Sequence, residues 1–271
     1  MIKQFLILLG MLAVIPAFSA ENLIRPEGGW PNAAVDAELS QAEGTRVLRL
    51  SKSKGWIYIG DKMTIDPAKT YTISMDLRSA DPAALSRMNY IGLVMYDERN
   101  RAVVRDNVQS VPGAFAKVAA DTPAGAVQIT LDRVVDLSNA AKKGLCLAIN
   151  AKEDFSDMPN RNCTGKITKV QTVDGKTVFT LAKPYADALP AGTQVRVHYI
   201  MAGFSYGILL GGLGAEWKHY TVRVSGFAMD GSAGYDKFWP GAKTFQLLFV
   251  VNPDANIQSS VLVKNISVTA E

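Results

Sequence analysis

Residues that commonly perform catalysis are scarce in this chain: only two histidines and two cysteines occur among 271 residues. The cysteines, Cys146 and Cys163, have no neighbouring pair of histidines, which argues against a zinc site. His-Glu-x-x-His and phosphate-binding-loop motifs are absent as well. The sequence therefore gives no support to the common metalloprotease and nucleotide-dependent mechanisms.

Clusters of one charge and long apolar runs are also missing. The formal net charge is only +4, and the lysines and arginines are scattered along the chain, so the pattern favours neither nucleic acid nor anionic lipid as a partner. No segment after residue 20 has an apolar run long enough to predict a transmembrane segment. Helical periodicity is nearly absent, and only the short stretches 81–87 and 138–143 are helix candidates.

The first 20 residues are typical of a secretory signal peptide. Lys3 precedes the apolar run Phe5–Ile15, and the small residues Ser19 and Ala20 suit a cleavage site. The run is shorter than the roughly 20 residues that a transmembrane helix requires. We therefore expect a signal peptide at 1–20 and an exported protein, periplasmic or extracellular.

Export bears on the two cysteines. An oxidising compartment favours a disulfide between Cys146 and Cys163. Two unpaired thiols are the alternative, because sequence spacing does not show whether the side chains meet.

The segment 66–78 carries the clearest secondary-structure signal. Asp66-Pro67 favours a turn, and Tyr71, Ile73, Met75 and Leu77 then alternate with polar residues. Such alternation predicts a strand with one face on a core and the other in water. Similar runs recur between turn residues along the chain, which predicts an all-β sandwich or barrel.

Residues 150–214 differ from their surroundings. Lys166–Val173 and Lys176–Leu181 flank Asp174-Gly175, a strong hairpin signal. The glycine-rich stretch 203–214 is expected to be a loop. We interpret residues 150–214 as a β insertion between two strands of a single β-sandwich domain spanning 21–271.

Several segments resemble jelly-roll carbohydrate-binding modules of the galactose-binding-like superfamily. They are Asn22-Leu23-Ile24-Arg25-Pro26 with Gly28-Gly29-Trp30, the Pro-x-Lys-Thr-Tyr-x-Ile-Ser-x-x-Leu-Arg strand at 67–78, Glu216-Trp217-Lys218-His219-Tyr220-Thr221-Val222, and the closing stretch 260–269. The resemblance covers about residues 22–131 and 215–270. It implies a jelly-roll β-sandwich with an inserted β-hairpin lobe, and binding of a polysaccharide or oligosaccharide without catalysis or an organic cofactor.

Many of these modules hold a structural calcium ion with an acidic pair on the closing strand. This chain has Lys264-Asn265 at that place, so a calcium site would depend on other oxygen ligands such as Asp36 or Glu38. Calcium therefore stays open at this point.

Aromatic rings are the candidate ligand-binding groups, because they stack against the C–H face of sugar rings. Trp56 and Tyr58 lie two residues apart on one strand and point outward if the adjacent isoleucines fill the core. Trp239 lies in an expected loop, and loops carry function more often than strands do. Burial in the core is the alternative for each. For Trp217 the family resemblance implies a structural role, because this tryptophan usually packs at the sandwich edge in such modules. The candidate ligand-binding residues are Trp56, Tyr58, Trp239 and Trp30.

Two other functions stay open. A polysaccharide lyase on a β-sandwich could draw its base and its uronate-neutralising group from Arg196, His198, Tyr199 and His219, whereas a glycoside hydrolase needs two facing carboxylates, which the sequence does not single out. A structural or adhesive envelope protein is the third alternative. It is motivated by the scarcity of residues that commonly perform catalysis.

Overall fold

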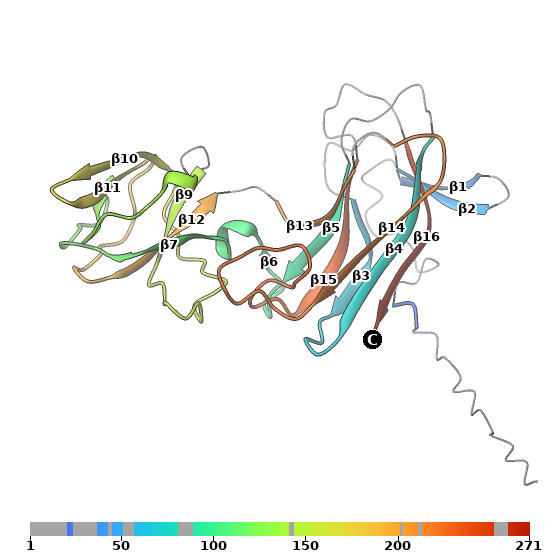
Figure 1. The fold of residues 1–271 in the computed structure, drawn as a ribbon, viewed down its shortest axis with the longest axis horizontal. Coiled ribbons are helices and arrows are strands. Elements are labelled where there is room, and N and C mark those ends of the chain that lie inside the picture. The colour runs from blue at the N-terminus through green and yellow to red at the C-terminus, as the bar shows by residue number, and fades with distance from the viewer. Residues whose placement is uncertain are drawn as a thin grey trace, which may run out of the picture.

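Antiparallel strands make up nearly all the regular structure of the protein, seen in a computed structural model (Figure 1). It describes residues 21–23, 37–42, 45–50, 57–80, 89–140, 144–200, 203–210, 213–251 and 260–271. The helices in these ranges are short 3₁₀ turns, η2 (Arg105–Asn107) and η3 (Ser138–Ala140). None of the helices described is long or apolar enough to cross a membrane. The predicted all-β fold is confirmed, whereas the helix candidate at 81–87 lies outside the described residues.

Two five-stranded sheets form the β-sandwich that was expected. One has the strand order β1-β2-β16-β4-β14, and the other has the order β13-β5-β15-β3 with β6 paired to β5. The strands of the first sheet are β1 (Ala37–Ala42), β2 (Thr45–Leu50), β16 (Val261–Ala270), β4 (Thr70–Ser79) and β14 (Lys218–Ser225). Those of the second are β13 (Ser205–Leu210), β5 (Asn89–Tyr96), β15 (Thr244–Val251), β3 (Ile57–Thr64) and β6 (Ala102–Val103).

The alternating residues of β4 fill the space between these two sheets. Burial alternates strictly along β4, with its apolar side chains buried. Tyr71 meets Phe238 and Phe245 edge to face, with ring centroids 5.3 and 5.2 Å apart. Its hydroxyl donates to the Thr64 carbonyl at 2.9 Å, which satisfies the polar end of a buried ring. The predicted strand and its core-facing side are therefore confirmed.

The third sheet forms a separate lobe with its own core. Its strand order is β7-β12-β9-β10-β11-β8, and a bridge between Val118 and Leu131 joins the two outermost strands, which closes the sheet into a small barrel. Phe179, Leu147 and Val197 are fully buried inside it. We call residues 110–200 the barrel lobe; Figure 1 shows it beside the sandwich. Its strands are β7 (Ser110–Lys117), β8 (Gln128–Thr130), β9 (Gly144–Ile149), β10 (Ile167–Val173), β11 (Lys176–Leu181) and β12 (Gln194–Ile200).

The barrel lobe corrects the expected bounds of the insertion. The lobe begins at Ser110 rather than near residue 150, and β8, placed by the resemblance in the sandwich, pairs with β11 instead. The glycine-rich stretch expected to be a loop contains β13, which pairs with β5 of the sandwich. The hairpin prediction is confirmed: Asp174 and Gly175 have φ values of 49° and 70°, as a tight hairpin turn requires.

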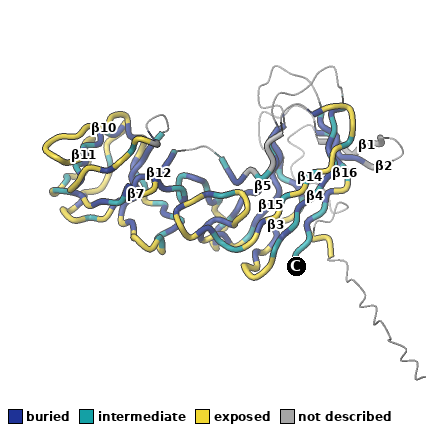
Figure 2. The backbone as a smooth tube through the Cα atoms, viewed as in Figure 1, coloured by how far each residue is buried: buried dark blue, intermediate teal, exposed yellow. Residues whose placement is uncertain are grey.

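A loop of the barrel lobe, residues 152–162, fastens it to the sandwich. Met158 enters the sandwich core, and the Asn160 amide donates to the Asn107 carbonyl at 2.9 Å. Arg161 forms an ion pair of 3.0 Å with Asp97, which lies just after β5. Figure 2 shows buried residues in both lobes and where the two lobes meet, and it shows exposed residues along the β10–β11 hairpin.

Candidate functional site

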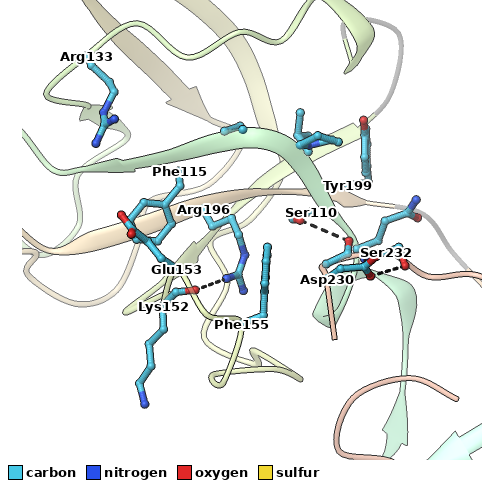
Figure 3. A pocket seen from close by; sticks show the side chains of 16 residues that line it. Ser110, Phe115, Arg133, Lys152, Glu153, Phe155, Arg196, Tyr199, Asp230 and Ser232 are labelled. Carbon is cyan, nitrogen blue, oxygen red and sulfur yellow. Dashed lines mark hydrogen bonds between the residues drawn. The ribbon is translucent and has the colours of Figure 1, made fainter. Parts of the chain in front are cut away.

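A cavity of about 670 Å³ lies where the two lobes meet. The barrel lobe contributes most of its lining, from β7, β12 and the 152–162 loop, and the sandwich contributes the segment 230–232 (Figure 3). Cavities of this size between lobes are typical places for small-molecule binding. We therefore treat the junction cavity as the candidate site.

Arg196 on β12 lines the cavity and is held there by several hydrogen bonds. Its side chain is 3% exposed, and its Nη2 donates to Oδ2 of Asp157 at 2.8 Å. Nη1 donates to the Lys152 carbonyl at 2.8 Å, and Nε donates to Nε2 of His198 at 3.0 Å. A guanidinium has five N–H groups in a rigid fork. The charge of Arg196 and most of its N–H donors therefore interact with the 152–162 loop and hold that loop in place.

Asp157 is the carboxylate that makes the burial of Arg196 tolerable. Burial alone would raise its pKa, but hydrogen bonds from Asn160 and Arg196, together with the Arg196 charge, outweigh that effect and lower it. Asp157 is therefore ionised at neutral pH, and the ion pair is complete.

His198 is part of the same buried network. Its Nδ1 donates to the Asp106 carbonyl at 2.8 Å, so Nε2 is the acceptor for Arg196. Burial lowers the pKa of His198 to about 4, and the neighbouring Arg196 charge acts in the same direction. A neutral imidazole with both nitrogens engaged and no exposed surface holds structure rather than transferring protons.

Three aromatic side chains reach the cavity from the barrel lobe: Phe115 on β7, Phe155 in the 152–162 loop, and Tyr199 on β12. The Phe155 ring lies 4.8 Å from the Arg196 guanidinium, a cation–π contact. Its backbone has φ of 61°, an uncommon value for a bulky residue. A local strain of this kind is tolerated where surrounding contacts fix the residue.

Gly231 allows the sandwich segment to approach the barrel lobe closely. The Ser110 amide donates to the Gly231 carbonyl at 2.9 Å across the junction. A Cβ atom on Gly231 would lie 2.8 Å from the Phe155 ring, and its φ of 73° also favours glycine. The shape of the cavity therefore depends on Gly231 from the sandwich and on Phe155, with its uncommon φ, from the barrel lobe.

The polar groups of the cavity suit recognition of hydroxyl groups. Oε1 of Gln109 is buried and has no hydrogen-bond donor within the described part of the chain. The hydroxyl and the amide of Ser232 donate to Asp230 at 2.6 and 3.1 Å, which lowers the Asp230 pKa and keeps it ionised. Arg133, Lys152 and Glu153 are exposed at the rim. The site thus offers acceptors and charges beside aromatic rings.

Of the predicted aromatic residues that the structure describes, neither Tyr58 nor Trp239 lines this cavity. Trp239 was expected at the surface, and this is wrong: it is fully buried in the sandwich core, and its Nε1 donates to the Gly234 carbonyl at 3.1 Å. The segment around Trp239 is held against the sandwich because the side chains of Phe238 and Trp239 both pack into the sandwich core. Trp30 and Trp56 lie outside the described residues.

Tyr58 has the orientation that its strand predicted. Ile57 and Ile59 are buried in the core, and Tyr58 lies half-buried on the opposite face of β3. There it packs with Leu248 and Tyr96, and burial raises its pKa. Tyr58 does not line the junction cavity, so its role as a ligand-binding residue stays a prediction.

The four residues considered for a lyase do not come together. Arg196 and Tyr199 line the cavity, and His198 lies buried behind it. His219 lies instead on β14, where its Nδ1 donates to Asp76 at 2.7 Å and its side chain is 62% exposed. His219 is not among the residues that line the cavity.

Trp217 has a structural setting at the sandwich surface. It is half-buried, with the Lys264 ammonium 4.2 Å from its ring centroid and the Arg78 guanidinium at 5.0 Å. Lys264, at the place of the expected acidic pair, is thus engaged by an aromatic ring. Among the described residues, no cluster of three His, Cys, Asp or Glu side chains could hold a metal ion. Asp36 and the side chain of Glu38 are outside that description.

Cys146 and Cys163 are adjacent thiols in this structure. Both are free, with Cys146 buried on β9. A hydrogen bond between the two thiols is the largest cause that raises the pKa of Cys146, and burial adds to it. The Cys163 thiol also donates to the Asn160 carbonyl at 3.4 Å. The cysteine pair therefore lies next to the 152–162 loop, to which Asn160 belongs.

Sequence reasoning missed most of the cavity lining, including Gln109, Phe115, Phe155 and Asp230. One signal was present: Arg196 interrupts the apolar run Val195–Val197, and a charged residue in a buried strand usually has a specific partner. The partner, however, comes from a loop that no local pattern connects to β12.

Comparisons with known proteins do not assign the chain to a family. It matches no family model, and searches of curated proteins and of solved structures found no significant match. The resemblance to galactose-binding-like modules therefore stays a prediction, and the functional argument depends on the site itself.

Proposed function

We propose that this protein is an exported, non-catalytic carbohydrate-binding protein that holds a short oligosaccharide in the junction cavity. One observation carries the proposal: the cavity of about 670 Å³ combines aromatic rings with a buried acceptor that lacks a donor. Sugars present apolar C–H faces and hydroxyl donors together, and both features have a counterpart in this lining.

The aromatic and polar groups have separate roles in this proposal. Phe115 and Tyr199 provide apolar surface for a sugar ring, while Gln109 and Asp230 accept hydrogen bonds from hydroxyl groups. The Arg196–Asp157 pair does not touch the sugar in this scheme; it keeps the 152–162 loop in place. A preformed site of this kind lowers the ordering cost of binding.

A lyase is disfavoured because His198 is buried and neutral and His219 lies elsewhere on the sandwich. A glycoside hydrolase is the second candidate, since Glu153 and Asp230 both line the cavity. A general acid needs a raised pKa, whereas hydrogen bonds from Ser232 lower that of Asp230. Binding without hydrolysis is therefore the better-supported function.

Isothermal titration calorimetry, guided by a glycan array, tests the proposal. The Phe115→Ala protein is expected to bind the selected oligosaccharide about tenfold more weakly, equivalent to about 1.4 kcal/mol. Tyr58→Ala is the matched control, because it removes a half-buried aromatic residue outside the cavity. Equal loss in both variants, or no glycan binding by the wild type, would contradict the proposal. Release of new reducing ends would favour the hydrolase instead.

Export and a jelly-roll, galactose-binding-like ancestry belong to the same proposal, supported by the signal-peptide pattern and the sandwich fold. An oxidising compartment would also pair Cys146 with Cys163, whose thiols are in contact. Mass spectrometry of the exported protein under non-reducing conditions is expected to show the loss of two hydrogen atoms. An unchanged mass, with both cysteines alkylated after unfolding, would argue against the disulfide.

A further inference from the structure

We propose that the junction cavity selects an uncharged sugar over a uronate, an inference that rests on the proposed function. The first step concerns Arg196, the cation most deeply placed in the lining. Its guanidinium already donates to Asp157, His198 and the Lys152 carbonyl. Binding a sugar carboxylate there would require breaking a buried ion pair, which is strongly unfavourable.

The charges at the rim balance one another. Among the described residues that line the cavity, Arg133 and Lys152 are exposed cations, and Glu153 and Asp230 are exposed anions. Figure 3 shows Asp230 on the opposite side of the cavity from Glu153 and Lys152. The exposed rim thus has no excess positive charge for a carboxylate, and Asp230 repels one directly.

The buried acceptor points to the same ligand class. Oε1 of Gln109 needs an O–H or N–H donor, because an unpaired buried acceptor costs free energy. A hydroxyl group can donate to it, whereas an ionised carboxylate can only accept. Gln109 therefore favours a hydroxyl over a carboxylate at its own position, and Asp230 disfavours a negative charge near it.

The test compares two oligosaccharides that differ only at C6, galactose oligomers and galacturonate oligomers of equal length, by isothermal titration calorimetry on the full mature chain. The neutral oligomer is expected to bind at least about tenfold more tightly, with little change between low and high salt. Tighter binding of the galacturonate would overturn the inference while leaving carbohydrate binding in place. If neither oligomer binds, and a neutral glycan array is also silent, both proposals fail.

A charge-altered variant sharpens the test. Glu153→Gln combined with Asp230→Asn leaves the two rim cations uncompensated, so galacturonate affinity is expected to rise about tenfold at low salt and fall again at high salt. Glu98→Gln is the matched control, an exposed carboxylate outside the cavity. A rise in the control of similar size, or no rise in the double variant, would show that the rim charges do not set the selectivity.

Discussion

The sandwich and the barrel lobe both bury large apolar cores, but the contacts around the two cores differ. The sandwich core is closed by aromatic contacts, in which Tyr71 packs edge-on against Phe238 and Phe245. The barrel lobe instead buries the Arg196–Asp157 pair and His198 on the side that meets the sandwich. Buried ion pairs add little net stability but fix geometry well. The Arg196–Asp157 pair therefore contributes more to the shape of the site than to the stability of the barrel lobe.

Removing an aromatic anchor of the sandwich is expected to have the largest effect. Trp239→Ala would leave a cavity in the core and should lower the free energy of unfolding by about 4 kcal/mol, measured by urea denaturation. Trp217→Ala, which removes a half-buried surface tryptophan, is the control and should cost much less. A small effect of Trp239→Ala would show that the aromatic residues of the sandwich core contribute little to the free energy of unfolding.

Breaking the buried pair tests the other side of the comparison. Asp157→Ala would leave Arg196 charged and unpaired, and should cost about 3 kcal/mol and weaken glycan binding. Asp154→Ala changes a neighbouring exposed carboxylate of the same loop and should preserve binding. Glycan affinity that survives Asp157→Ala unchanged would mean that the pair does not shape the cavity.

Acid should weaken the barrel lobe through His198. Its folded pKa of about 4 lies below the ordinary value of 6.5, so the unfolded chain takes up a proton first as pH falls. Stability should therefore drop by about 1.4 kcal/mol per pH unit between about pH 6.5 and 4. Denaturation at several pH values in wild type and His198→Asn measures this slope. An unchanged slope in the variant would exclude His198 as its source.

The smallest effect is expected at the contact that ties the lobes together. Arg161→Ala removes the 3.0 Å pair with Asp97 and a 3.0 Å hydrogen bond to the Ala102 carbonyl. Since Arg161 is partly exposed, the loss should be about 1 kcal/mol. Thermal unfolding would measure it, with Arg133→Ala, whose 3.6 Å pair is fully within the barrel lobe, as the comparison. A larger loss than for Asp157→Ala would reverse the order proposed here.

Local patterns predicted what depends on local geometry. Alternation placed Tyr71 and Leu77 on the core side of β4, and Asp174-Gly175 marked the turn between β10 and β11. Buried isoleucines beside Tyr58 put that residue on the opposite face of β3, as expected. The same reasoning misplaced Trp239, because a loop and a buried segment can share one sequence composition.

The amino-acid pattern alone predicts that this chain forms strands and where many of them turn, because a strand has a fixed period of two residues and tight turns require particular backbone angles. The pattern does not predict that β8 pairs within the barrel lobe, that β13 pairs within the sandwich, or that Arg196 contacts Asp157. These contacts join residues far apart in the chain, and packing rather than local backbone preference selects them. The junction cavity arises from those same long-range contacts.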